Sequence, residues 1–301
     1  MTASCPVCGA AGLVRSLTTP GILVQRCPDC SHRVAEHVPT AAAVQDYHRQ
    51  YEEGGFLESL AATRRRQASV IIRLVAGYLE APDQLLDYGA GRGWFLEACR
   101  EAGYRSLAGA DTSELAVDSL RARGFEALRL PTVTSGPPEL YGLTFRPRVL
   151  TLLDVVEHFP PPDLRAMLAG LVASLQPELE LIVIKVPVAD GLLYRTAVRL
   201  AKLGVMGPIE QLYQVGTSPP HFNYFSARSM GRLLQLSGMH LLERRGDSDF
   251  EGDSLANRAR PIRRLPKPAA SLFGSTLQSL VDLTGSHDAS IFVIKPGIPK
   301  S

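Results

Sequence analysis

The feature that most constrains the fold is the stretch at residues 85–96, Leu-Leu-Asp-Tyr-Gly-Ala-Gly-Arg-Gly-Trp-Phe-Leu. An apolar run leads into an acid, three alternate glycines follow, and apolar residues then recur at helical spacing. This order predicts a buried strand, a turn without side chains and the first turn of a helix. Glycine is needed where the backbone adopts positive φ or passes close to a ligand, and a helix N-terminus offers N–H groups to a polar ligand. The stretch therefore predicts a ligand-binding turn in an α/β domain.

A second acid points to an adenosine-containing ligand. Asp111 lies 22 residues after Gly89, at the end of another apolar stretch, where an acid can bind the hydroxyls of a ribose. The glycine spacing is G-x-G-x-G rather than the G-x-G-x-x-G of dinucleotide sites, and Asp87 beside the turn would repel a pyrophosphate. The carboxylate of Asp87 beside the turn would instead attract an ammonium group of a ligand. S-adenosylmethionine (SAM) fits this pattern, because it carries an ammonium, a sulfonium and an adenosine.

Four of the five cysteines lie in the first 30 residues, as two C-x-x-C pairs separated by 18 residues. This spacing matches a zinc site in which each pair presents two thiolates to one tetrahedral ion. The predicted zinc ligands are Cys5, Cys8, Cys27 and Cys30. The alternative, two disulfides or two redox pairs, is disfavoured in a reducing compartment. The fifth, Cys99, falls in a predicted helix and is expected to be a small buried hydrophobe.

The composition is that of a soluble globular protein. The 301 residues suffice for an α/β core and one small module, and the apolar and charged fractions of 45% and 21% are ordinary. A net charge of +2 argues against a large nucleic-acid-binding surface. There is no secretory signal at the N-terminus and no apolar run of membrane-spanning length. We expect a cytoplasmic protein without a nucleic-acid partner, and composition leaves the oligomeric state open.

Three segments are expected: a zinc ribbon at 1–38, a helical linker or cap at 39–80 with Arg64, Arg65 and Arg66 mostly solvated, and an α/β domain at 81–301. In the last, strand and helix signals alternate, which predicts a mainly parallel sheet between helices. The strands are expected at 84–88, 106–110, 125–130, 149–153, 179–186, 240–244 and 289–294. The helices are expected at 93–102, 113–123, 163–175 and 226–238, the last three capped by Ser113, Asp163 and Ser226. An insertion at 187–225 is expected to form a lid.

Three further motifs follow predicted strands or precede a helix cap, where ligands of open α/β sheets bind. They are Asp-x-x-Glu-His-x-x-Pro at 154–161, x-Val-Pro at 185–187 and His-x-x-Tyr-Phe-Ser at 221–226. With the acid and the glycine turn, they resemble the class I SAM-dependent methyltransferases, and among these a bacterial subgroup that acts on small molecules. The resemblance covers about residues 84–245. The N-terminal cysteine ribbon is similar to that of the group's sugar C-methyltransferases. Those chains carry a further large C-terminal domain, which we do not expect here.

The resemblance implies a doubly wound, mainly parallel, seven-stranded Rossmann-like methyltransferase sheet. It also implies that Asp87 and the glycine turn hold the methionine part of SAM, and that Asp111 holds the ribose. The implied cofactor-binding residues are Asp87, Gly89, Ala90, Gly91, Gly93, Asp111, Thr112, Asp154 and Val155. Family members often have an acid after the third strand that contacts adenine. Here the strand ends in Arg-Leu-Pro-Thr at 129–132, so backbone groups are expected to hold the adenine.

Methyl transfer needs mainly alignment of the acceptor, worth on the order of 7–11 kcal/mol, and a base helps where the acceptor is a hydroxyl or an acidic carbon. Histidine has a suitable pKa, and His158 and His221 both fall at the predicted acceptor end. The alternative for each is a loop histidine bonded to backbone. Tyr224 is a candidate to orient the acceptor, or else a packed core aromatic. We expect both imidazoles to face one cavity roofed by the insertion.

Two segments raise the question of a further partner. Residues 191–206 form an amphipathic pattern with Arg195, Arg199 and Lys202 on one narrow stripe. We favour the interpretation that this segment is a lid helix packed on the domain. The more specific alternative is a surface that contacts a membrane or a lipid-linked substrate. The basic cluster at 258–267 is either a solvated loop or a contact for phosphate groups.

The sequence thus predicts a SAM-dependent methyltransferase with a structural zinc ion and a small-molecule acceptor, such as a sugar, a natural product or a lipid-linked intermediate. One alternative is an RNA methyltransferase whose ribbon recognises the nucleic acid. The near-neutral charge and the lack of an Asn/Asp-Pro-Pro-Tyr-type motif after the fourth strand argue against it. The other is a catalytically silent zinc-ribbon interaction protein, which the intact glycine turn and Asp111 argue against.

Overall fold

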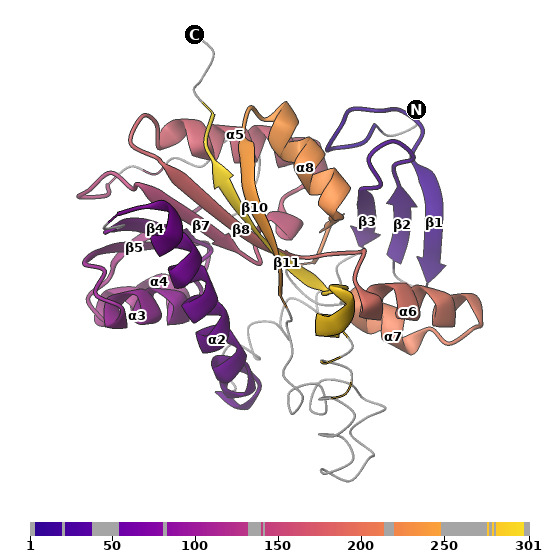
Figure 1. Cartoon of the computed structure of the whole chain (residues 1–301), viewed down its shortest axis with the longest axis horizontal. Coiled ribbons are helices and arrows are strands. Elements are labelled where there is room, and N and C mark those ends of the chain that lie inside the picture. The colour runs from indigo at the N-terminus through magenta and orange to yellow at the C-terminus, as the bar shows by residue number, and fades with distance from the viewer. Residues whose placement is uncertain are drawn as a thin grey trace.

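A computed structural model of the chain describes residues 4–19, 22–37, 54–80, 83–131, 140, 142–213, 220–247, 276, 279 and 281–297. Side chains are described from residue 63 onward in the first long helix, and not for Gln211. The predicted helical residues 39–53 and the basic cluster at 258–267 lie outside these ranges. Within them, the chain forms one large sheet between helices and a smaller sheet beside it (Figure 1).

The large sheet is seven-stranded and mainly parallel, as predicted. Its strands are β4 (Gln84–Tyr88), β5 (Ser106–Asp111), β6 (Glu126–Arg129), β7 (Val149–Leu153), β8 (Leu181–Pro187), β10 (His240–Asp247) and β11 (Ala289–Lys295). They lie in the order β10-β11-β8-β7-β4-β5-β6. Strand β11 runs antiparallel to both of its neighbours, and the other pairs are parallel. This places the carboxyl ends of β4, β5, β7 and β8 at one edge, where ligands of such sheets bind.

Helices cover both faces of this sheet, because side chains alternate between the two faces along each strand. Leu85 and Val149 pack in one core cluster with helices α2 (Gly54–Tyr78), α3 (Trp94–Glu101) and α4 (Glu114–Ala122). Leu86 and Leu150 pack in the other with α5 (Leu164–Ser174) and α8 (Ala227–Leu236). Figure 1 shows α2, α3 and α4 below the sheet and α5 and α8 above it. The sheet is therefore doubly wound, as predicted.

Two of the three predicted helix caps are confirmed. The Ser113 hydroxyl accepts a hydrogen bond from the Ala116 N–H, and Ser226 forms a capping box at the start of α8. Asp163 occupies the N-cap position of α5, but its side chain makes no capping hydrogen bond. The reason lies in the preceding 3-10 turn, η2 (Pro161–Asp163), which gives Asp163 helical dihedral angles, whereas a capping side chain needs an extended backbone.

The small sheet combines the N-terminal ribbon with part of the insertion. Strands β1 (Val14–Thr19), β2 (Ile22–Arg26) and β3 (Arg33–His37) form an antiparallel meander. A fourth strand, β9 (Asn223–Tyr224), pairs with β3 and comes from the far end of the insertion. The ribbon therefore shares its sheet with a segment that lies next to the predicted acceptor histidines.

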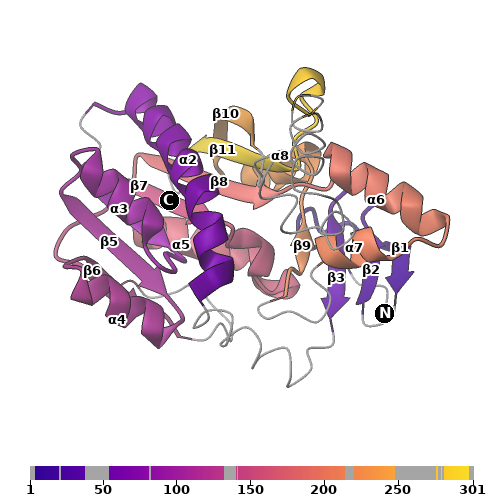
Figure 2. The same cartoon turned by 90° about the horizontal axis from the view of Figure 1, so that it is seen from below.

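The rest of the insertion forms helices α6 (Leu192–Lys202) and α7 (Gly207–Leu212), which pack on this small sheet (Figure 2). Tyr194 and Ala197 are buried there against Val24 and Ala35 of the ribbon. The amphipathic pattern expected at 191–206 is therefore buried only in part, since Leu203 near its end is 79% exposed. No helix among the described residues combines the length and the apolar character needed to cross a membrane.

Candidate active site and cysteine cluster

The glycine turn lies at the carboxyl ends of β4 and β5. Gly89, Gly91 and Gly93 have φ values of 81°, 52° and 70°, in the left-handed region that side chains disfavour. A Cβ on Gly89 would lie 2.4 Å from Cγ2 of Val155, so glycine is also required by the close approach of the loop after β7. The Gly89 and Ala90 N–H groups donate to the Ala110 carbonyl at 2.7 and 3.1 Å. The turn is thus fixed to β5 before any ligand binds.

Asp111 at the end of β5 supports this turn directly. Its Oδ2 accepts from the Gly91 N–H and its Oδ1 from the Ser113 N–H, each at 2.8 Å. Burial raises the pKa of Asp111, and these backbone hydrogen bonds partly offset that rise. A carboxylate has about four lone-pair positions, so two amide contacts leave acceptor capacity for the hydroxyls of a ligand.

Asp87 lies on the neighbouring strand, only 3% exposed. Its Oδ1 accepts a hydrogen bond from the Thr151 hydroxyl at 2.7 Å. Burial raises the pKa of Asp87 to about 7, although this hydrogen bond acts in the opposite direction. Burial therefore favours the protonated carboxyl group in the ligand-free protein, and a cationic group of a ligand would hold it in the charged form.

Asp154, directly after β7, forms an ion cluster that the sequence analysis missed. Its carboxylate accepts from Lys185 Nζ at 2.7 and 3.0 Å and from Arg64 Nη1 of α2. Burial opposes its ionisation, but Arg64 and Lys185 together hold the pKa of Asp154 well below its ordinary value. Asp154 has a φ of 59°, and these contacts stabilise that strained backbone. The expectation that Arg64 is solvated was wrong.

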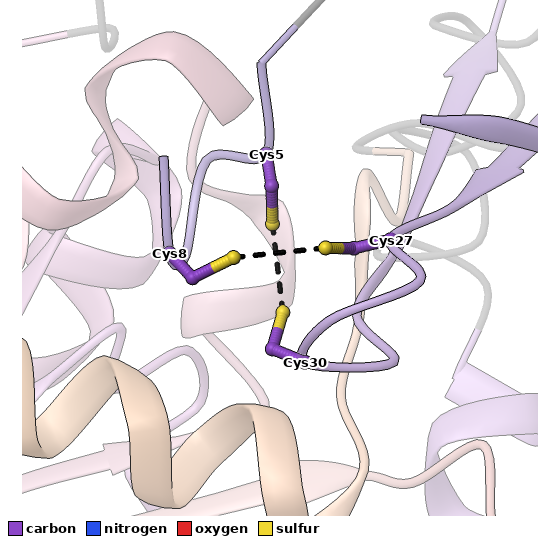
Figure 3. Close-up of side chains that lie close together, drawn as sticks. All are labelled: Cys5, Cys8, Cys27 and Cys30. Atoms are coloured by element: carbon purple, nitrogen blue, oxygen red, sulfur yellow. Dashed lines mark hydrogen bonds between the residues drawn. The ribbon is translucent and has the colours of Figure 1, made fainter. Parts of the chain in front are cut away.

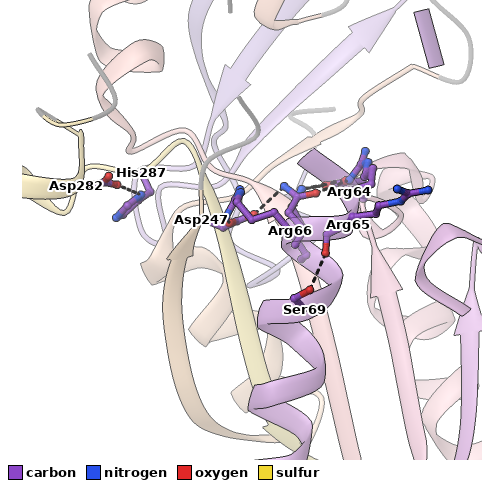
Figure 4. Close-up of polar contacts among 10 residues, drawn as sticks. Arg64, Arg65, Arg66, Ser69, Asp247, Asp282 and His287 are labelled. Atoms are coloured by element: carbon purple, nitrogen blue, oxygen red, sulfur yellow. Dashed lines mark hydrogen bonds and ion pairs between the residues drawn. The ribbon is translucent and has the colours of Figure 1, made fainter. Parts of the chain in front are cut away.

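A second acid anchors the same turn of α2. Asp247, at the end of β10, accepts from Arg66 at 3.0 Å and from Gln67 Nε2 at 2.8 Å. Figure 4 shows Arg66 directed at Asp247 while Arg65 points away. The solvated state predicted for Arg64–Arg66 holds for the exposed Arg65 and fails for the other two. Successive residues of a helix point about 100° apart, so Arg64 and Arg66 reach Asp154 and Asp247 on either side of the outward-facing Arg65.

The two predicted histidines lie against each other. His158 belongs to the 3-10 turn η1 (Val156–His158), His221 precedes β9, and their ring centroids are 4.6 Å apart. His158 Nδ1 donates to the Pro220 carbonyl at 2.9 Å, which leaves Nε2 as the acceptor nitrogen. Burial lowers the pKa of His158, so its imidazole is neutral at neutral pH. His221 is 8% exposed.

Tyr224 lies one step further away, with its ring centroid 6.0 Å from that of His221. It is buried in the cluster formed by the ribbon and the insertion, and its hydroxyl donates to the Tyr213 carbonyl at 3.2 Å. That proton is therefore already engaged. A role of Tyr224 toward an acceptor stays a prediction.

Backbone and amide contacts bind the histidine segment to η1 and to the ribbon. The Phe222 N–H donates to the Glu157 carbonyl at 2.9 Å. Asn223 Nδ2 donates to the Phe159 carbonyl at 2.6 Å, and Asn223 Oδ1 accepts from His32 Nε2 of the ribbon at 3.2 Å. Asn223 and His32 are fully buried. The sequence signal for Asn223 was a polar residue within an aromatic stretch, which alone does not reveal its partner.

The four predicted cysteines converge at one point (Figure 3). The Sγ atoms of Cys5 and Cys30 lie 3.6 Å apart, as do those of Cys8 and Cys27. This excludes disulfides, whose sulfurs lie about 2.05 Å apart. It is close to the edge of a tetrahedron with zinc–sulfur bonds of about 2.3 Å, which is about 3.8 Å. The cluster therefore fits a zinc ion.

The two cysteine knuckles share one backbone geometry. Gly9 and Ser31, each following the second cysteine of its pair, have φ values of 76° and 65°. The Gly9 N–H donates to the Cys5 carbonyl and the Ser31 N–H to the Cys27 carbonyl, at 2.8 and 3.0 Å. Each turn thereby directs both of its sulfurs to the same side. A hydrogen bond from the Cys30 thiol lowers the pKa of Cys5, which favours the thiolate form that a zinc ligand requires.

A family model described as a methyltransferase domain matches residues 60–244, more than half of the chain. The chain belongs to this family. It is therefore an enzyme of the SAM-dependent methyltransferase class, as predicted. Asp87, the glycine turn and Asp111 offer a donor and acceptor set that fits SAM, since a buried and a partly buried carboxylate on two adjacent strands suit an ammonium group and ribose hydroxyls. A search of curated proteins gave no match.

Several solved structures are similar to this chain, all at low sequence identity. A complex between the Haloferax volcanii Trm112 methyltransferase activator and the putative methyltransferase matches with a TM-score of 0.55 and 12% identity, over 86% of this chain and 99% of that chain. Magnesium protoporphyrin IX methyltransferase from Synechocystis, with bound S-adenosylhomocysteine, has a TM-score of 0.48 and 14% identity, over 84% and 94%. A SAM-dependent methyltransferase from Archaeoglobus fulgidus has 0.43 and 16%, over 77% and 94%. The first supports the fold assignment, and none assigns an acceptor.

Proposed function

We propose that this methyltransferase transfers the methyl group of SAM to a small-molecule acceptor at the carboxyl ends of β4, β5, β7 and β8. The observation that carries the proposal is the pairing of two features at this edge. The glycine turn supported by Asp111 lies against Val155, and the same loop leads three residues later into the histidine pair. Cofactor and acceptor functions are thus connected by one short segment, 154–158.

In this proposal the residues of β4 and β5 hold the cofactor. Asp87 accepts the ammonium, the turn at 89–93 follows the methionine part, and Asp111 with Thr112 holds the ribose hydroxyls. SAM supplies a methyl group on a sulfonium that is already a good leaving group. The protein therefore has mainly to align the acceptor, and alignment alone is worth on the order of 7–11 kcal/mol. The ion cluster of Asp154, Arg64 and Lys185 supports this alignment by fixing the loop after β7.

We assign acceptor binding to the part of the site around His158 and His221, and in this proposal the two histidines activate the acceptor. The Nε2 of His158 is directed away from the Pro220 carbonyl and is available to accept a proton from a hydroxyl or an acidic carbon. A sugar, a natural product or a lipid-linked intermediate fits this chemistry. The overall charge of +2 favours these over RNA. The cysteine cluster is proposed to hold structural zinc and to keep the shared sheet in place.

The cofactor assignment is tested by thermal unfolding. SAM or S-adenosylhomocysteine is expected to raise the melting temperature, because a ligand that binds only the folded state stabilises it, and NAD is expected to leave it unchanged. Equal stabilisation by NAD would contradict the assignment.

The acceptor assignment is tested by replacing one histidine. His221→Ala is expected to lower kcat while the Kd for S-adenosylhomocysteine stays unchanged, because acceptor activation belongs to the chemical step. The exposed His240 on β10 provides the control variant, His240→Ala. Methylated products from extracts, with small-molecule and RNA fractions offered separately, identify the acceptor class. Full turnover in both histidine variants, His158→Ala and His221→Ala, would remove the pair from the mechanism.

A further inference from the structure

A second set of metal-ligating side chains lies apart from the cysteines. Glu157, His158 and His221 each place one ligand atom within 4.8 Å of the other two. We propose that these three side chains bind a divalent transition-metal ion at the acceptor end of the site. Two imidazoles and one carboxylate are ligands that zinc and its neighbours in the first transition row accept, and three protein ligands leave coordination positions for an acceptor.

The backbone holds these ligands in place without an ion. Glu157 and His158 are consecutive residues of η1, and the His158 N–H closes that turn on the Val155 carbonyl at 2.9 Å. His221 is held against them because the Phe222 N–H donates to the Glu157 carbonyl. Ligand atoms in a tetrahedral site with bonds of about 2.1 Å lie about 3.4 Å apart. The present spacing, within 4.8 Å, is wider than this, so binding an ion would draw the three ligand atoms closer together.

The orientation of His158 also fits a metal ligand. Its Nδ1–H is bound by the Pro220 carbonyl at 2.9 Å, so the lone pair is on Nε2. A metal-bound histidine commonly donates its other ring N–H to a carbonyl or a carboxylate, which fixes the tautomer and the ring orientation. The arrangement thus supplies the outer contact that a ligating imidazole requires.

The surroundings favour a cation. The Glu157 side chain is fully buried and His221 nearly so. A buried carboxylate favours a positive charge nearby, and a divalent ion bound by Glu157 and the two imidazoles would supply one. The site also differs from the cysteine cluster in ligand chemistry, because nitrogen and oxygen ligands select ions differently from four thiolates.

This site refines the acceptor class, and that refinement rests on the proposed methyl transfer. With the ion bound, the imidazole nitrogens are its ligands, and the ion takes over acceptor activation by lowering the pKa of a bound hydroxyl. The hydroxyl proton passes to solvent, the oxygen electron pair forms the new O–CH₃ bond, and the pair of the broken C–S bond returns to sulfur. The predicted acceptor is therefore a hydroxyl compound.

Zinc itself is the probe. Full-length protein is titrated with zinc and analysed by elemental analysis and calorimetry. Two zinc ions per chain are expected, one at the cysteines and one at the proposed site. Glu157→Gln, His158→Ala and His221→Ala are each expected to retain the cysteine zinc and to lose the second one, whereas His240→Ala retains both. His158 is only partly buried, so its variant keeps the test valid if Glu157→Gln fails to fold.

The outcomes separate the two proposals. A single zinc ion in the wild type, or a second ion kept by all three variants, would overturn the metal site. Thermal stabilisation by S-adenosylhomocysteine in the same samples tests the proposed cofactor site independently of the metal site. A second zinc ion whose selective removal leaves hydroxyl methylation unchanged would overturn the oxygen-activation step, while the proposed methyl transfer would stand.

Discussion

At the scale of single residues, Asp111 combines a structural and a binding task. It accepts from Gly91 and Ser113, and in the proposed function it also accepts from the ribose. Asp111→Ala is therefore expected to weaken S-adenosylhomocysteine binding by roughly 1.5–3 kcal/mol, the range for hydrogen bonds to a charged group. Calorimetry measures this directly. Asp118→Ala, an exposed acid on α4, is the control, and an unchanged Kd for Asp111→Ala would contradict the ribose assignment.

Asp87 gives the enzyme a pH dependence. Burial raises its pKa from 3.8 to about 7, so the folded state holds the proton that the unfolded state has lost between these values. The contribution of this group to the free energy of unfolding is fully present below the unfolded-state pKa and is lost as pH rises through about 7. Within that range the slope is about 1.4 kcal/mol per pH unit.

Asp87→Asn is expected to remove this slope, because asparagine does not titrate. Urea unfolding of the ligand-free protein at pH 5 and pH 8, for wild type and variant, measures the difference. Asp118→Asn is again the control. A wild type that is equally stable at both pH values, relative to Asp87→Asn, would show that Asp87 has an ordinary pKa in the folded protein.

Which residues the sequence revealed depends on whether their role is local. The glycine turn, Asp87, Asp111 and the cysteine knuckles are recognisable because strand, turn and spacing lie within one short stretch. Arg64 and Lys185 could not be recognised in this way, because both bind Asp154, and Asp154 lies 90 residues from Arg64 in the chain. A lysine in an otherwise apolar strand was the one local signal of that ion cluster.

At the scale of elements, β9 connects the ribbon to the proposed acceptor end of the site. Asn223 within it holds the Phe159 carbonyl and His32. Asn223→Ala leaves two buried groups, the Phe159 carbonyl and the His32 ring, without their hydrogen bond to Asn223. Each lost hydrogen bond is expected to lower the free energy of unfolding by about 1–3 kcal/mol. It is also expected to lower kcat, because the His221 segment loses its attachment, while S-adenosylhomocysteine binding is retained.

Urea unfolding and steady-state kinetics together measure these effects, with Gln235→Ala on the exposed side of α8 as the control. A variant with wild-type stability and kcat would show that β9 is held by its strand pairing alone.

The long elements were predictable, and the short ones were not. Strands β4 and β7 match their predicted bounds because each is a short, largely apolar segment buried on both faces. Strand β9 consists of two residues, and its pairing with β3 is decided by tertiary contacts alone. The insertion was therefore expected as a lid, whereas its helices pack on the ribbon; closure over the cofactor stays a prediction.

At the scale of the whole molecule, the ribbon and the large domain share one core. Cys5, Cys27 and Cys30 belong to the same buried cluster as α5 and α8. Cys27→Ser is expected to lose the ribbon zinc and to unfold the ribbon, with little change in the secondary structure of the large domain. Because β9 depends on β3, turnover is expected to fall with it, while S-adenosylhomocysteine still binds.

Zinc analysis, circular dichroism and calorimetry check these expectations together. Cys99→Ser, a buried cysteine outside the cluster, separates the loss of zinc from the loss of a thiol. A zinc-free Cys27→Ser protein with full activity would mean that the two parts of the molecule function independently.

The pairing of β3 with β9 also sets an order of events during synthesis. His32 and Asn223 are 191 residues apart in the chain. At ribosomal rates of 5–20 residues per second, roughly 10–40 s pass between the emergence of these two residues. Through that interval the nascent ribbon has three strands and no fourth, and a unit of this size has too little apolar core to persist alone. If the cysteines bind zinc as proposed, early metal capture would stabilise the ribbon, the first part of the chain to be synthesised, until β9 emerges.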